Sequence, residues 1–143
     1  MAEPQLQDAA AASLKQWHAM VARRELGALP ALLAPGVVFR SPMAHTPYPG
    51  PQATSMILGT VIDVFEGFTY HRELASADGL SVVLEFSATV HGKELKGIDM
   101  IRFDEQGRIV EFEVMVRPLS GLQALGEEMG RRLGPVLAQM KGA

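Results

Sequence analysis

The sequence contains no cysteine. Without thiols the chain cannot form disulfide bonds, bind a metal ion through thiolates or use a cysteine nucleophile, and thiol redox chemistry is excluded as well. The absence is typical of proteins that work in a reducing compartment. Residues 1–17 also lack the basic segment followed by an apolar one that marks a secretory signal. We therefore expect a cytoplasmic protein.

Long hydrophobic runs and clusters of basic residues are missing too. The most apolar stretch, residues 27–39, is interrupted by two prolines and two glycines, and it is shorter than the roughly 20 residues that span a bilayer. The net charge is −3, and lysine and arginine occur in ones and twos along the chain. No basic patch is available for phosphate groups. We expect a soluble protein whose partners include neither nucleic acid nor membrane.

The composition that remains is that of an ordinary globular protein. Apolar residues make up 48% and charged residues 20% of the 143 positions, far from the composition of disordered chains. A length of this order corresponds to one domain of about 100–200 residues. No internal repeat or low-complexity linker divides the sequence, so we expect a single domain over residues 1–143.

The first third of the chain is predicted to be helical and then to enter a strand. Apolar residues three and four positions apart predict a helix over about residues 5–24. A short second helix over residues 28–33 is expected to end at Pro35-Gly36, since neither residue type continues a helix well. Residues 37–41 then read as a strand.

Two further helices are predicted around the middle and at the end of the chain. After a proline-rich, irregular loop, Pro51 suits the first position of a third helix that ends near Gly67. Ser120 and Gln123 have the spacing of a capping box, which predicts a C-terminal helix that starts at Ser120. Proline inside a helix costs a hydrogen bond, so Pro135 is expected to kink or interrupt it.

Between these helices the apolar period changes from about 3.6 to two. From residue 68 to residue 117, apolar residues alternate with polar ones in four segments separated by turn signals at 77–79, 91–93 and 104–107. Short turns can join antiparallel strands only. The pattern predicts a four-stranded antiparallel meander with one buried face.

This order of elements resembles the cone-shaped fold of the nuclear transport factor 2 superfamily. The segment GIDMIRFDEQGRIVEFEVMV, residues 97–116, is similar to the paired last strands of the SnoaL-like polyketide cyclases and the ketosteroid isomerases. LLAPGVVFRSP and Gly50 match the first strand and the start of the third helix. The resemblance implies an α+β fold in which a curved antiparallel sheet forms a cone, packed against N-terminal helices, with a C-terminal helix.

The resemblance also permits a comparison of catalytic positions. Asp99 matches the aspartic acid that the isomerases keep protonated in an apolar site, where it donates a hydrogen bond to a developing oxyanion. The isomerase base precedes a proline at the end of the first strand, where this chain has Ser41-Pro42. The oxyanion tyrosine falls on Trp17, which cannot replace a phenol. Steroid isomerisation by that mechanism is therefore not expected.

The apolar residues around Asp99 also indicate a role for this carboxyl group. Strand alternation places Asp99 on the same face as Ile101 and Phe103. A carboxyl group among apolar side chains either holds its proton or finds a partner, because desolvation disfavours the charge. We expect Asp99 to be a catalytic acid, base or hydrogen-bond donor; the alternative is a structural carboxyl satisfied by a neighbouring hydroxyl or arginine.

Two histidines are further catalytic candidates. His18 follows Trp17 on the first predicted helix, and His45 lies in the proline-rich loop, where either could reach a cavity as an acid or base. The ordinary alternative is a solvent-facing or locally bonded histidine. Neither has the spacing of a metal site, so we expect no metal and no other cofactor.

Aromatic and polar side chains near the predicted cavity are expected to bind an apolar small molecule. In a cone the inner faces of helices and sheet diverge, so that some of their apolar side chains line a pocket and the others fill the core. The ligand-binding residues that we expect are Trp17, Phe39, Ser41, Tyr48, Phe65, Phe86 and Phe112.

The outer sheet face is predicted to carry Ile98, Met100 and Met115 beside charged residues. In the superfamily that the chain resembles, such a face is commonly covered by a second copy, so we expect a homodimer. We interpret the chain as a SnoaL-like small-molecule-binding protein that uses no cofactor, with proton transfer on an apolar carbonyl compound as its isomerase- or cyclase-type chemistry. The alternative is a non-catalytic ligand-binding or dimeric assembly domain.

Overall fold

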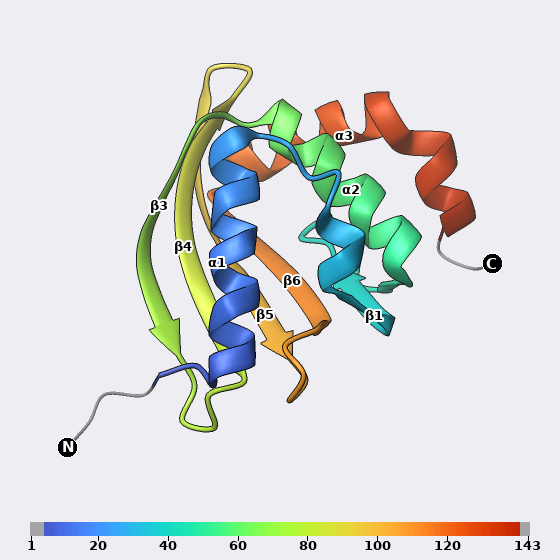
Figure 1. The fold of residues 1–143 in the computed structure, drawn as a ribbon. Helices are drawn as coiled ribbons and strands as arrows, with labels where there is room; N and C mark the ends of the chain where they lie inside the picture. Colours follow the sequence, from blue (N-terminus) through green and yellow to red (C-terminus); the bar gives the residue numbers. More distant parts are fainter. Residues whose placement is uncertain (1–4, 141–143) are drawn as a thin grey trace.

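The computed structural model describes residues 5–140 as a curved six-stranded sheet with three α-helices packed on it (Figure 1). This arrangement confirms the predicted α+β class. Over this part of the chain no helix has the length and apolar character that a membrane span requires. The helical elements are α1 (Asp8–Arg23), the 3-10 helix η1 (Leu29–Leu32), α2 (Pro51–Val64) and α3 (Leu119–Met140).

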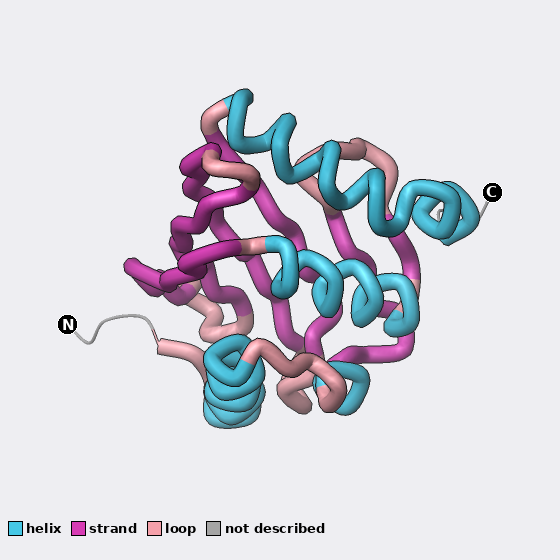
Figure 2. The backbone as a smooth tube through the Cα atoms, turned by 90° about the horizontal axis from the view of Figure 1, so that it is seen from above, coloured by secondary structure: helices cyan, strands magenta, loops and turns pink. Residues whose placement is uncertain are grey.

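The strands follow the order β2-β1-β6-β5-β4-β3 across the sheet. Strands β3 to β6 pair antiparallel in sequence order, as the period of two predicts, whereas β1 pairs with β6 in parallel. Figure 2 shows the strands curving around the space that α2 occupies. The strands are β1 (Leu33–Arg40), β2 (Tyr48–Pro49), β3 (Glu66–Ala75), β4 (Ser81–Val90), β5 (Lys93–Phe103) and β6 (Ile109–Arg117).

The boundary between the second helix and the first strand differs from the prediction. The helical turn η1 stops at Leu32, and β1 already starts at Leu33, so Pro35 and Gly36 belong to the strand. The pairing of β1 with β6 shifts register between Leu33 and Val38. Such an irregularity tolerates a proline because the ladder is interrupted there. The proline-rich loop likewise contains the short strand β2, which pairs with β1.

Helix α3 confirms one prediction and corrects another. It begins at Leu119, one residue before the predicted cap, so Ser120 lies inside the first turn and is not the capping residue. The helix continues through Pro135 without a break, and its axis changes direction toward the C-terminal end in both ribbon views (Figures 1 and 2). Proline therefore bends this helix, as its missing N–H group predicts.

Two side chains fix the positions of the helices around the sheet. Arg24 ends α1 in the left-handed conformation (φ 54°), and its guanidinium donates hydrogen bonds to the carbonyl oxygens of Ile62 (2.7 Å) and Phe65 (2.9 Å) at the end of α2. Glu128 of α3 is buried and pairs with His91, in the turn between β4 and β5, at 3.0 Å. The helices thereby border one common space.

A close approach inside the sheet depends on Gly97 of β5. A Cβ atom at this position would lie 2.7 Å from Cζ of Phe86, so only glycine leaves room for that ring. The ring of Phe86 packs against those of Phe65 and Phe68, with centroids 5.5 and 5.0 Å apart. This aromatic cluster packs beside the space that the helices enclose.

Candidate functional site

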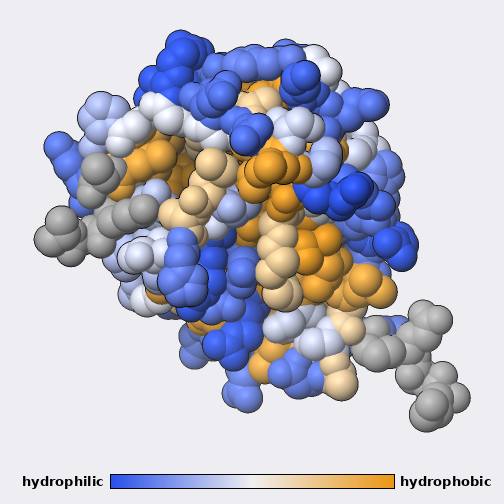
Figure 3. All heavy atoms as spheres, turned by 180° about the vertical axis from the view of Figure 1, so that it is seen from behind, coloured by the Kyte–Doolittle hydropathy of each residue, from blue (hydrophilic) through white to orange (hydrophobic). Residues whose placement is uncertain are grey.

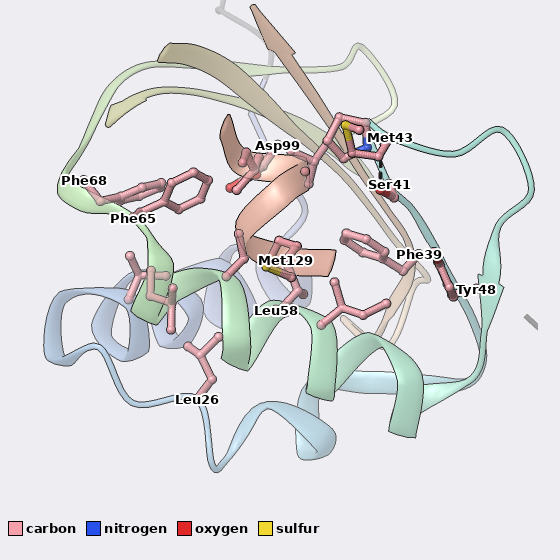
Figure 4. Close-up of a pocket in the computed structure, with 18 of the residues that line it drawn as sticks. Leu26, Phe39, Ser41, Met43, Tyr48, Leu58, Phe65, Phe68, Asp99 and Met129 are labelled. Atoms are coloured by element: carbon pink, nitrogen blue, oxygen red, sulfur yellow. Dashed lines mark hydrogen bonds between the residues drawn. The ribbon is translucent and has the colours of Figure 1, made fainter. Parts of the chain in front are cut away.

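A cavity of about 150 Å³ lies between the helices and the inner face of the sheet. Figure 4 shows side chains from β1, α2, β3, β5 and α3 that converge on it. Its wall is apolar apart from a few groups. Among the described residues that line it, Asp99 is the one acidic residue, and there is no lysine, arginine or histidine. An apolar cavity with one convergent polar group is the usual form of a small-molecule site.

The sheet brings Asp99 to the inner end of this cavity. Asp99 lies in the middle of β5, between Leu84 of β4 and Val114 of β6, and its side chain is 6% exposed. The inward orientation is the one that alternation with Ile101 and Phe103 predicts. The carboxyl group is thus held by a central strand, which is among the most rigid parts of a sheet protein.

A phenol that the sequence interpretation did not include contacts this carboxyl group. Tyr70 of β3 donates a hydrogen bond to Oδ2 of Asp99 at 2.5 Å. The indole Nε1 of Trp17 in turn donates to the Tyr70 hydroxyl oxygen at 3.0 Å. Tyr70 could have been noticed because Phe68 and Tyr70 share a strand face in the segment FTY. The three side chains form one chain of hydrogen bonds from α1 through β3 to β5.

Burial dominates the proton affinity of this group. Desolvation raises the pKa of Asp99 to about 7, although the hydrogen bond from Tyr70 works in the opposite direction. The pKa of Tyr70 is raised well above its ordinary value, first by burial and then by the neighbouring charge of Asp99. Asp99 therefore exchanges its proton near neutral pH, while Tyr70 keeps its own.

Comparison with known proteins gives the family of this chain. The SnoaL-like domain matches residues 14–112. The chain belongs to the SnoaL-like family. A search of curated proteins finds no match.

Solved structures similar to this SnoaL-like chain share its fold. A crystal structure described as a steroid delta-isomerase from Pseudomonas aeruginosa is 68% identical, with 95% of this chain and 99% of that chain covered and a TM-score of 0.91. An uncharacterised protein with a cystatin-like fold from Silicibacter pomeroyi DSS-3 is 29% identical over 92% of this chain and 93% of that chain (TM-score 0.83). An NTF2-like protein from Mesorhizobium loti, 17% identical over 82% and 100% (TM-score 0.70), shares the fold.

Both candidate histidines of this SnoaL-like chain lie outside the cavity wall. Nε2 of His18 is 2.9 Å from Oε1 of Glu73, the His18 ring packs edge-on against Tyr70, and His18 is not among the residues that line the cavity. His45 is exposed in the loop before β2. The expectation that either reaches the cavity is therefore corrected, since one turns toward a surface carboxylate and the other toward solvent.

The aromatic candidates divide between the cavity and the core. Phe86 and Phe112 have no exposed surface and lie in the core behind the wall, so the expectation that they line the pocket is corrected. Alternation identifies an inward side chain but not its depth, and both are covered by other aromatic rings. The expected residues that do line the cavity are Trp17, Phe39, Ser41, Tyr48 and Phe65.

The rim of the cavity consists of the loop after β1 and the facing surface of α3. Ser41 lines the cavity, and its hydroxyl oxygen accepts a hydrogen bond from the backbone N–H of Met43 at 3.0 Å. Met43 extends over Gly126 of α3, where a Cβ atom would lie 2.8 Å from the Met43 sulfur. Neither sequence periodicity nor a motif indicates these rim contacts, because they join segments far apart in the chain.

The raised pKa of Asp99 predicts a specific dependence of stability on pH. Because the folded pKa is above the unfolded one, the free energy of unfolding falls as pH rises from about 4 to about 7. Asp99→Asn keeps an acceptor for Tyr70 but carries no charge. We expect this variant to gain stability over the parent across that range, by on the order of 4 kcal/mol above pH 7.

Urea denaturation of parent and variant at pH 4.5 and pH 8 measures this difference. The control is Asp63→Asn, which removes an exposed carboxylate from α2 and is expected to give the same small difference at both pH values. A gain for Asp99→Asn that does not grow with pH would show that the Asp99 carboxyl titrates in its ordinary range.

Proposed function

We propose that this chain binds an apolar carbonyl compound in the cavity and transfers a proton on it through Asp99. The observation that carries the proposal is a buried carboxyl group at the end of an apolar cavity, hydrogen-bonded at Oδ2 only among the described residues. The 68% identity to a structure described as a steroid delta-isomerase supports an isomerase-type activity.

The proposed chemistry needs one group that both takes and returns a proton. A general base is most effective when its pKa lies near the working pH, and burial brings the pKa of Asp99 to about 7. The ionised carboxylate removes a proton from the carbon next to the carbonyl, which leaves an enolate and a neutral carboxylic acid. That acid then delivers a proton, either the original one or one exchanged with solvent, to the enolate, at the same carbon or at a conjugated one.

Because position 41 is a serine, Asp99 both removes and returns a proton. A serine hydroxyl is not a base near neutral pH, so the second carboxylate that the isomerases use at this place is not available. The wall around Asp99 is otherwise mostly apolar, which leaves the carbonyl compound as the partner of the carboxyl group. The proposed substrate is therefore apolar, enolisable and small enough for a cavity of about 150 Å³.

Deuterium exchange into 2-cyclohexenone tests this proposal. Its single ring suits a cavity of about 150 Å³, a volume that holds benzene in another protein. We expect the parent chain to accelerate exchange of the protons next to the carbonyl in D₂O, followed by ¹H NMR. Asp99→Asn should lose roughly 100-fold or more of this acceleration while it still binds the ketone.

The control variant is His45→Gln, which alters an exposed loop histidine and should exchange at the parental rate. Binding of the ketone without exchange in the parent would favour the non-catalytic alternative, a ligand-binding domain. Parental exchange in Asp99→Asn would contradict the role proposed for the carboxyl group.

We also propose that the outer sheet face pairs with a second copy of the chain. Met115 and Leu74 expose 43% and 57% of their surface there, and Ile98 lies opposite Met115 in the ladder. Around them are ion pairs such as Arg40 with Glu111. Figure 3 shows apolar patches among hydrophilic residues on the side of the molecule turned away from the viewer in Figure 1. An apolar centre with a polar rim suits a protein interface.

Sedimentation equilibrium tests the dimer. The parent chain should sediment as a dimer, and Met115→Lys should sediment as a monomer because the substitution buries unpaired charges in a symmetric interface. The control is Val136→Lys, on α3 and 37% exposed, which should leave the dimer intact. A monomeric parent, or a dimer that tolerates Met115→Lys, would contradict this assignment.

A further inference from the structure

The hydrogen bonds between Trp17, Tyr70 and Asp99 run in one direction only. An indole N–H can donate a hydrogen bond but cannot accept one. The Tyr70 oxygen must therefore accept at the 3.0 Å contact with Trp17 Nε1, and the one phenol proton is left for Oδ2 of Asp99 at 2.5 Å. If Asp99 donated to the Tyr70 oxygen instead, the phenol proton would meet no acceptor among the other described residues, and a buried hydroxyl proton without a partner costs free energy.

This direction distinguishes the two oxygens of the carboxyl group. Oδ2 accepts the phenol proton, and none of the described residues forms a hydrogen bond with Oδ1. Since Asp99 lines the cavity, the unbonded oxygen is the one available to a ligand. We propose that Trp17 is a positioning residue: by donating to the Tyr70 oxygen, it strengthens the hydrogen bond that this hydroxyl donates to Oδ2, which holds Oδ2 in that bond and leaves proton transfer to Oδ1.

The inference deepens the proposed function and rests on it for the identity of the transferred proton. The hydrogen-bond chain itself does not depend on any substrate. It can therefore be tested on the ligand-free protein, and its failure can be told apart from a failure of the exchange experiment.

Packing alone does not explain the indole at this position. The Trp17 ring is 3% exposed and meets the ring of Phe112 edge-on, with centroids 5.2 Å apart. Phenylalanine would keep an aromatic contact of this kind. It would lack the N–H group that donates to Tyr70, so Trp17→Phe separates the hydrogen bond from the packing.

Few groups near Asp99, other than Tyr70 and Trp17, could change the properties of its carboxyl group. On the neighbouring strands Leu84 and Val114 flank it, and α3 contributes Leu125 to the cavity wall. On α1 the titratable side chain that contacts Tyr70 is His18, whose ring lies against the phenol and whose Nε2 pairs with Glu73. His18→Gln removes the ion pair and therefore any influence that it has on Asp99.

A ¹³C NMR titration of the Asp99 carboxyl group tests the chain of hydrogen bonds. Tyr70→Phe removes the bond that stabilises the ionised form, so the Asp99 pKa should be highest in this variant. Trp17→Phe leaves a phenol that is a weaker donor, because neighbouring hydrogen bonds strengthen one another. Its Asp99 pKa should lie between those of the parent and Tyr70→Phe.

Phe39→Leu serves as the matched control, since it changes an aromatic residue of the cavity wall that has no polar atom. Its Asp99 pKa should equal the parental value, and so should that of His18→Gln. An unchanged Asp99 pKa in Trp17→Phe would overturn the role of the indole, and an unchanged pKa in Tyr70→Phe would overturn the whole chain.

The parent protein provides a second measurement that needs no core substitution. Trp17 is the one tryptophan of the sequence, so its indole N–H gives an unambiguous ¹H–¹⁵N signal. This signal should shift with a midpoint at the Asp99 pKa, and the shift should vanish in Asp99→Asn. An indole signal that does not follow the titration of Asp99 would contradict the inference.

Discussion

The arrangement of this protein depends on the burial of one carboxyl group. Removing Asp99 from water makes its ionised form costly, and the hydrogen bond from Tyr70 offsets only part of that cost. A group held in this way has a proton that is neither tightly bound nor freely lost near neutral pH. The apolar cavity next to it determines what can exchange that proton, because charged and strongly hydrated molecules would lose too much solvation on entry.

Segments that are far apart in the sequence surround the buried carboxyl group and supply its hydrogen bond. Strand β5 places Asp99 at the centre of the sheet, β3 curves to bring Tyr70 to it, and α1 adds the N–H of Trp17. Glycine at position 97 admits the ring of Phe86 and closes the core beside the site. Membership of the SnoaL-like family accounts for the shared framework, while the chemistry depends on the few polar groups placed on it.

The sequence predicted the fold and part of the site for identifiable reasons. Periods of about 3.6 and of two record which faces are buried, so the helices, the meander and the inward direction of Asp99 follow from them. The phenol partner does not, because the bulge after Tyr70 and the curvature of β3 depend on pairing with β4. For the same reason alternation could not separate Phe86 and Phe112, in the core, from Phe39, which lines the cavity.

The proposed reaction requires that Oδ1 of Asp99, the free oxygen of the buried carboxyl group, face an apolar carbonyl compound. A crystal structure of the complex with 2-cyclohexenone tests it most directly. We expect the ketone inside the cavity, with its enolisable carbon beside Oδ1 of Asp99 and with Tyr70 still bonded to Oδ2. A ketone bound in another groove, or one that displaces Tyr70 from Oδ2, would contradict it.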